Sequence, residues 1–389
     1  MQSIRHRVLL SVLGFSAFCA ATLVVADTRD NALALFSFAE STYPELASPA
    51  EPEVQEIQGA YVRFYSDTGI YLGLQGDDVY ATGGPLGTEV TYYGKLSELI
   101  AVTDSDITDV LLSNRRGECT YYAENRFANV VDIKRNIPFE GNIEITIDGD
   151  ECVINTNSIP NHDFNDNTAA FATNVSEVSA EFRIPTVPSF AASTTAISLT
   201  TDNAVLLNGV KVDLLAAGCF GVGDGKIGCN DMNQAWRYDP MSSLTQFGTD
   251  QHNAHTQPDG TYHYHGNPQA LFDQDPNTES PVIGFAADGF PIFGSYIDED
   301  GQIRAVSSSF QFKSGSRATG SGNPGGSYDG EFVDDYEYIE GSGDLDECNG
   351  MMRAGVYGYY VVDEYPWVLA CYKGTPNSSF DKSGGGPPP

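Results

Sequence analysis

The first 26 residues constrain the rest of this 389-residue chain, because they decide the compartment in which it folds. Arg5 and Arg7 precede an apolar run from Val8 to Val25, and Ala26 completes an approximate small-residue cleavage site. This order is typical of a secretory signal peptide. A membrane anchor is the alternative, since the run is almost long enough to span a bilayer. We expect cleavage after residue 26 and a periplasmic or secreted protein without a membrane contact.

Six cysteines follow this segment, and an even number in an exported chain indicates disulfides. Cysteines that are neighbours in the sequence form three local pairs: Cys119 with Cys152, Cys219 with Cys229, and Cys348 with Cys371. Sequence alone leaves other pairings open. Thiolate metal ligands are a further alternative, although the chain has no Cys-x-x-Cys spacing.

Acidic residues dominate the charge, with 53 Asp and Glu against 20 Lys and Arg and a net charge of −33. The signal segment holds two Arg and no acid, so the net charge after cleavage is −35. A nucleic-acid partner is excluded, because phosphates repel such a surface. Disorder is excluded by 41% hydrophobic and 11% aromatic residues. An acidic surface also attracts divalent cations, which suits a metal site as well as simple solubility.

Hydrophobic patterning predicts a small α+β module over residues 27–105 and a large β-rich domain over 115–380, followed by a flexible tail over 381–389. In the module, apolar residues at helical spacing in 28–43 precede strands at 60–65, 69–74, 79–82 and 89–93 and a helix at 95–101. In the large domain, strands are expected at 142–147, 180–184, 195–200 and 205–210. We therefore expect a mostly β protein: a large antiparallel β-sandwich or barrel-like domain with long loops, after a small α+β module.

Four of the five histidines that follow the signal segment fall within 14 residues: His252, His255, His263 and His265. If 261–265 is a strand, His263 and His265 point to one face, because side chains alternate with period 2. His255 can return across the turn to join them. Three His ligands with an open position are typical of catalytic zinc and of several copper sites. The alternative is a cluster that only packs and hydrogen-bonds.

The two remaining histidines are less certain metal ligands. His252 lies only three residues before His255 and is better suited to contact a ligand than to bind the metal itself. His162 is far away in the sequence and is either a ligand that the fold brings in or a surface residue. The predicted metal set is His255, His263, His265, His162 and His252, with copper or zinc as the ion. Tyrosines between the histidines favour copper weakly.

Several motifs together resemble the YHYH-domain family of exported bacterial proteins: DGTYHYHGNP, PVIGFAADGFPIFGSY and LDECNG, with SIPNHDF, VLLNGV, NAHTQPDG and YPWVLACYKGTP. The resemblance covers about residues 119–376. It implies an extracytoplasmic protein with a metal role, and places these residues in matching motifs: His162, His255, His263, His265, Asp288, Asp346, Glu347 and Asn349. Relatives often carry another His where this chain has Gly358, which would leave the site one donor short.

Residues 30–105 resemble a small module that recurs in secreted bacterial proteins, on the strings LFSFAESTYPEL, YVRFYSDTGIYLGLQGDDVYATGG and VTYYGKLSELI. The resemblance implies no established activity. Exposed Tyr beside acidic loops would suit contact with glycans or a cell surface, whereas a role in core and sheet packing is the alternative.

Asp288 and Glu347 are the candidate catalytic carboxylates, because an acid beside a metal can orient an imidazole or act as a base toward bound water. For Asp288 a hairpin turn with Gly289 is the alternative. We hypothesise an exported metal-binding protein. The alternatives are a metal-dependent secreted enzyme (a hydrolase or a copper oxidase) and a surface-adhesion protein with a structural His cluster. An open position beside a carboxylate would favour the enzyme.

Overall fold

The computed structural model of the chain describes residues 105–382 except 246 and 276, and before them residues 32, 35, 36 and 39 and five strands between residues 54 and 95. The signal segment, the predicted helix after residue 95 and the tail after residue 382 lie outside the described residues, so these stay predictions. The chain divides into two compact units, residues 1–103 with 146–150 and residues 104–145 with 151–389. The domain boundaries drawn from the sequence also stay predictions.

The described part of the first unit is an antiparallel sheet in the order β1-β2-β3-β4-β5. Its strands are β1 Val54–Ile57, β2 Ala60–Tyr65, β3 Ile70–Gln75, β4 Asp78–Thr82 and β5 Thr91–Lys95. The four described residues before the sheet are helical and buried: Ala32, Leu35, Phe36 and Ala39. Their spacing follows the helical period of the sequence.

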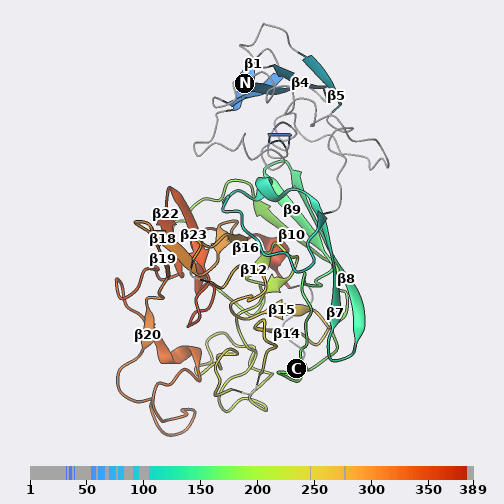
Figure 1. The fold of residues 1–389 in the computed structure, drawn as a ribbon. Coiled ribbons are helices and arrows are strands. Elements are labelled where there is room, and N and C mark those ends of the chain that lie inside the picture. Colours follow the sequence, from blue (N-terminus) through green and yellow to red (C-terminus); the bar gives the residue numbers. More distant parts are fainter. Residues whose placement is uncertain are drawn as a thin grey trace. The chain divides into compact units, whose positions relative to one another are not determined.

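A five-stranded sheet in the order β10-β9-β8-β7-β6 belongs to the second unit, except for the last three residues of β8 (Figure 1). Its strands are β6 Ser105–Asp106, β7 Asn125–Asp132, β8 Ile137–Asp148, β9 Glu151–Thr156 and β10 Ala180–Pro185. In β8 the predicted alternation is confirmed, because Ile143 and Ile145 are buried while Asn142 and Glu144 are exposed.

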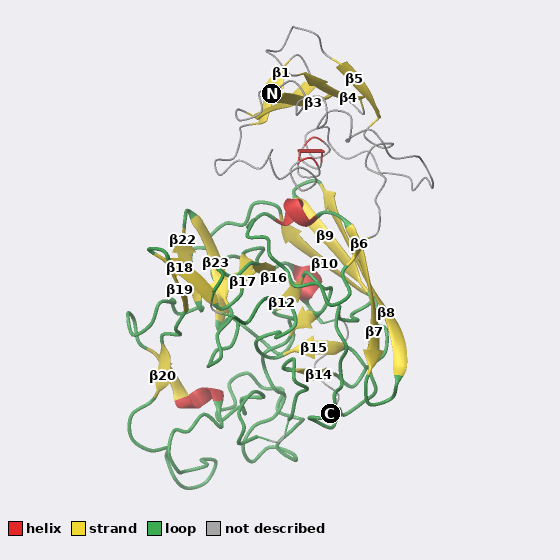
Figure 2. Ribbon diagram, viewed as in Figure 1, coloured by secondary structure: helices red, strands yellow, loops and turns green. Residues whose placement is uncertain are grey.

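An eight-stranded mixed sheet completes the core, in the order β14-β15-β13-β12-β16-β17-β23-β22. Its strands are β12 Ala204–Leu206, β13 Lys211–Val212, β14 Ala254–Thr256, β15 Tyr262–Tyr264, β16 Val282–Ala286, β17 Pro291–Phe293, β22 Gly350–Arg353 and β23 Val356–Tyr360. Two pairings in it are parallel, β13 with β15 and β17 with β23. Long loops join the strands (Figure 2). The mostly β, sandwich-like fold class is therefore confirmed.

Short two-stranded ribbons lie outside these sheets, pairing β11 Thr195–Ala196 with β24 Cys371–Tyr372, β18 Tyr296–Glu299 with β19 Gln302–Ala305, and β20 Phe310–Phe312 with β21 Tyr336–Tyr338. Three single-turn helices complete the described elements of this unit: η2 Cys119–Tyr122, η3 Val333–Asp335 and η4 Ser378–Phe380.

The two large sheets pack against each other through one hydrophobic cluster, to which both contribute buried side chains. Gly209 shows how close they come: a Cβ atom there would lie 2.4 Å from Thr156 Oγ1 and 3.4 Å from Ile143 Cβ. The same residue corrects the sequence prediction of a strand over 205–210. The strand ends at Leu206, because Gly209 N donates to Leu206 O at 2.9 Å and closes a tight turn with a φ of +82°. The strand predicted at 195–200 shortens to Thr195–Ala196.

Three disulfides join the cysteines in the predicted local pairs, Cys119–Cys152, Cys219–Cys229 and Cys348–Cys371, with Cα–Cα distances of 6.3, 5.7 and 4.6 Å. The first links the turn of η2 to β9, and the third links the loop before β22 to β24. These cross-links stabilise a fold with long loops by limiting the freedom of the unfolded chain. Within the described residues, no helix combines the length and apolarity that a membrane crossing needs.

Candidate metal centre

A tight hairpin brings the histidines of β14 and β15 together. The two strands are antiparallel, and His255 lies directly opposite His263. The turn between them is closed by Gly260 N donating to Gln257 O at 2.9 Å, and Gly260 has a φ of +91°. His265 follows His263 by two residues and therefore shares its face of the sheet. The predicted return of His255 across the turn is confirmed.

The three imidazoles, which we call the His trio (His255, His263 and His265), converge through their Nε2 atoms. His263 Nε2 lies 2.9 Å from His265 Nε2, which lies 3.0 Å from His255 Nε2. All three ligand atoms lie within 4.8 Å of one another. Two imidazole nitrogens that bind one tetrahedral ion at about 2.0–2.1 Å lie roughly 3.3–3.4 Å apart. The two short distances therefore need an increase of about 0.4 Å to hold an ion, and the third pair lies within 4.8 Å.

Contacts on the outer side of the rings orient these nitrogens. His255 Nδ1 lies 2.7 Å from the Gly248 carbonyl oxygen, which only accepts, so Nδ1 carries the hydrogen and Nε2 presents its lone pair. His263 makes a longer contact of the same kind with Thr261 O at 3.4 Å. A single proton on His265 Nε2 could serve only one of its two neighbours. A cation can accept electron pairs from all three rings.

Burial keeps the trio neutral. The side chains of His263 and His265 are 3% exposed, and His255 is half-buried. Loss of hydration lowers the pKa of all three imidazoles, and the neighbouring rings lower the pKa of His263 and His265 further. Neutral imidazole is the form that binds a metal ion. A buried His trio that could hold a metal ion is thus present in this chain.

Comparison with known proteins identifies the region around this trio. Residues 181–374 match the family described as YHYH protein. The chain carries a YHYH domain. No curated protein and no solved structure matches the chain. The match includes the whole trio but not residues 30–105, so the resemblance drawn for the amino-terminal module, with its glycan or cell-surface contact, stays a prediction.

Two of the predicted ligands lie away from the trio. His162 Nε2 is 2.6 Å from the Tyr264 hydroxyl, and His162 Nδ1 is 2.8 Å from Asp163 O, so protein groups contact both ring nitrogens. Burial lowers the pKa of His162 to about 3. His252 packs its ring on His162, with centroids 3.9 Å apart. Since Tyr264 and the trio point to opposite faces of β15, His162 and His252 belong to the other side of the sheet.

The candidate carboxylates of the YHYH domain also lie elsewhere in it. Asp288 occupies the turn between β16 and β17, where Oδ2 accepts from Tyr359 Oη at 2.6 Å and from Gly374 N at 2.8 Å. Strands β12 and β13 separate β16 from β15, a distance of roughly 14 Å at about 4.8 Å per strand. The hairpin-turn interpretation of Asp288 therefore agrees with its surroundings.

Glu347 and its neighbours lie beyond Asp288, before β22 at the far edge of the sheet from β14. The Glu347 side chain is 44% exposed and pairs with Lys373 Nζ at 2.7 Å. Asp346 pairs with the same ammonium at 3.0 Å, and Asn349 Nδ2 donates to two backbone carbonyls. These contacts tie the loop around Cys348 to the C-terminal segment, which is a structural role.

The fold of the second unit places other charged residues beside the trio, and the sequence interpretation missed them. Lys211 on β13 is the register partner of His263, so both share one face. Lys211 pairs with Asp202, and Lys382 pairs with both Asp202 and Asp213. Gln257 accepts from Lys211 and donates to Asp213, so these side chains form one ionic network. The available sequence signal was the alternation Lys211-Val212-Asp213 after the Asn-Gly turn, which places Lys211 and Asp213 on one face of a strand.

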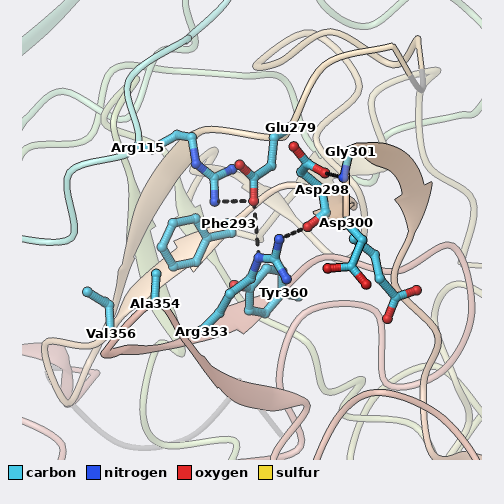
Figure 3. Close-up of a pocket in the computed structure, with 11 residues that line it drawn as sticks. Arg115, Glu279, Phe293, Asp298, Asp300, Gly301, Arg353, Ala354, Val356 and Tyr360 are labelled. Carbon is cyan, nitrogen blue, oxygen red and sulfur yellow. Dashed lines mark hydrogen bonds and ion pairs between the residues drawn. The ribbon is translucent and has the colours of Figure 1, made fainter. Parts of the chain in front are cut away.

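A pocket of about 740 Å³ lies in another part of the second unit (Figure 3). Arg115 and Arg353 both approach Glu279 Oε1, at 2.8 and 3.1 Å. Phe293 stacks on Tyr360 behind them, with centroids 5.1 Å apart. Both guanidinium groups thus share one protein carboxylate, and no histidine is among the residues that line this pocket. The trio remains the better candidate for chemistry.

Proposed function

We propose that this protein is an exported metal-binding protein whose YHYH domain holds one copper or zinc ion on the Nε2 atoms of the His trio. The convergence of three neutral imidazole nitrogens, two of them on buried rings, supports this function. Imidazole suits both metals. Three disulfides fit export to an oxidising compartment.

A metal-dependent enzyme is the second candidate, and one observation favours it. The trio offers three donors, the number that catalytic zinc sites use while a fourth position holds water. A buried carboxylate, Asp213, interacts electrostatically with His255, so charge of the kind that a metal-bound water needs lies nearby. The ion would supply a water polarised for attack.

Elemental analysis of the full chain expressed into the periplasm tests the binding function. We expect about one copper or zinc ion per wild-type chain and almost none after His263→Ala with His265→Ala, because each substitution removes one of three donors. The matched control is His252→Gln, which removes a histidine that packs on His162 and is not part of the trio, and which should keep the metal. Equal metal content in the wild type and the double variant would overturn the proposal.

A further inference from the structure

The face of the sheet that carries the trio continues onto the next strand. β13 runs parallel to β15, with Lys211 opposite His263 and Val212 opposite Tyr264. Asp213 N then donates to Tyr264 O at 3.0 Å, which extends the ladder by one residue. Asp213 therefore lies beside His265, and its side chain points to the same face as the trio.

The two carboxylate oxygens of Asp213 have different surroundings. Oδ2 accepts from Gln257 Nε2 and from Lys382 Nζ, both at 2.6 Å. Oδ1 is buried and has no hydrogen-bond partner among the residues that the structure describes. Asp213 as a whole is 4% exposed. A buried, ionised oxygen without a donor is unfavourable, so a group from solution with a hydrogen to donate is expected at Oδ1.

The position of the trio indicates where the hydrogen-bond donor to Asp213 Oδ1 lies. Asp213 interacts electrostatically with His255, yet it is not part of the group whose ligand atoms lie within 4.8 Å of one another. As a carboxylate beside the trio but outside its ligand group, Asp213 would reach a metal ion through one intervening molecule. Gln257 extends from the His255 face of β14 across to Asp213 and holds the carboxylate in this orientation.

We infer that Asp213 is the positioning residue of the fourth coordination position, where its Oδ1 accepts a hydrogen bond from water bound to the metal ion. This inference rests on the proposed function. The site would then have an open fourth position, selective for a ligand that has a hydrogen to donate. Asp213 would be the neighbouring carboxylate that Asp288 and Glu347 do not provide.

Asp202 provides a matched control for Asp213. It is also buried, at 7% exposed, and it pairs at 3.6 Å with Lys382, the lysine that pairs with Asp213, as well as with Lys211 at 3.0 Å. It precedes β12, one strand further from the trio than β13. Asp202→Asn therefore removes the same charge from the same network without touching the proposed water.

The experiment loads the full-length wild type, Asp213→Asn and Asp202→Asn with Co(II) and titrates each with azide, an anion that replaces bound water. Visible absorption reports both the cobalt content and the azide affinity. We expect about one Co(II) in each protein, with azide affinity raised on the order of tenfold in Asp213→Asn, because the water loses a charge-assisted hydrogen bond. Asp202→Asn should change it less than about twofold.

Equal azide affinities in the two variants would overturn the inference and leave the proposed function intact. Loss of cobalt from Asp213→Asn alone would also overturn it, since Asp213 would then be a ligand itself. Wild type that takes up no Co(II) would overturn the proposed function, and the inference with it. If Asp213→Asn does not fold, pulsed EPR of Cu(II)-loaded wild type in H2O and D2O decides: exchangeable protons of a bound water are expected, and their absence contradicts the inference.

Discussion

The two faces of β15 carry different chemistry although their residues alternate within one short strand. Tyr262 and Tyr264 point into the core, and each hydroxyl has a protein partner, Asp250 Oδ2 at 2.8 Å and His162 Nε2 at 2.6 Å. His263 and His265 point to the opposite face, where their Nε2 atoms approach each other at 2.9 Å. Burial does not distinguish the faces, because all four side chains are buried.

What distinguishes them is whether the polar atoms find partners within the protein. Buried polar groups are normally hydrogen-bonded, and the two tyrosine hydroxyls follow that rule. On the histidine face the acceptor atoms face one another, so a cation from solution is the natural partner. One face of β15 therefore stabilises the fold, and the other forms the candidate site.

Metal linkage is the largest effect expected from this difference. Free Zn(II) at about 1,000 times its dissociation constant should stabilise the wild type by about 4 kcal/mol, because the ion binds only the folded trio. Urea unfolding with and without zinc measures this gain. His263→Ala with His265→Ala should abolish it, whereas Tyr264→Phe, on the other face, should keep it. An equal gain in the double His variant would remove the distinction between the faces.

Substitution on the tyrosine face should reduce stability without loss of metal. Asp250 is 3% exposed and accepts hydrogen bonds from the Tyr262 hydroxyl and from three backbone N–H groups. Asp250→Ala leaves these donors without an acceptor and should cost about 2–4 kcal/mol of unfolding free energy. Urea unfolding gives the cost, and elemental analysis gives the metal content. A variant as stable as the wild type but without metal would reverse our assignment of the two faces.

The pH dependence sharpens the comparison, because His162 supports the tyrosine face. Its pKa is about 3 in the folded protein, against about 6.5 in an unfolded chain. Between these pH values His162 is protonated in the unfolded chain and neutral in the folded protein, so acidification destabilises the protein. The slope is at most about 1.4 kcal/mol per pH unit for this group. The measurement is the unfolding free energy at several pH values for wild type and His162→Gln. Identical slopes would contradict the low pKa.

The smallest effect is expected for a carboxylate that lies on neither face. Glu347 is partly exposed, and its ion pair with Lys373 is open to solvent. Glu347→Gln should change the unfolding free energy by less than about 0.5 kcal/mol and leave the metal content unchanged. Denaturation and elemental analysis check this directly. Loss of metal from Glu347→Gln would contradict this and would indicate that Glu347 belongs to the metal site.

Local patterns predicted a large part of this protein. The alternation in β8, the return of His255 across the turn and the three disulfide pairs all depend on residues that are close in the sequence. Asp213 escaped prediction because it reaches the trio through the parallel pairing of β13 with β15, and because its partner Lys382 lies 169 residues away. The positions of His162 and Asp288 could not be predicted either, because they also depend on contacts between residues far apart in the sequence.

The sequence by itself determined that His263 and His265 share one face, because side-chain alternation along a strand is a local property of the backbone. It also determined the mostly β character, and it favoured the local cysteine pairs, which the structure then established. Only the tertiary structure decided which groups surround the trio. Strand order and register between distant segments depend on how the hydrophobic faces of the sheets pack, and no local pattern encodes them.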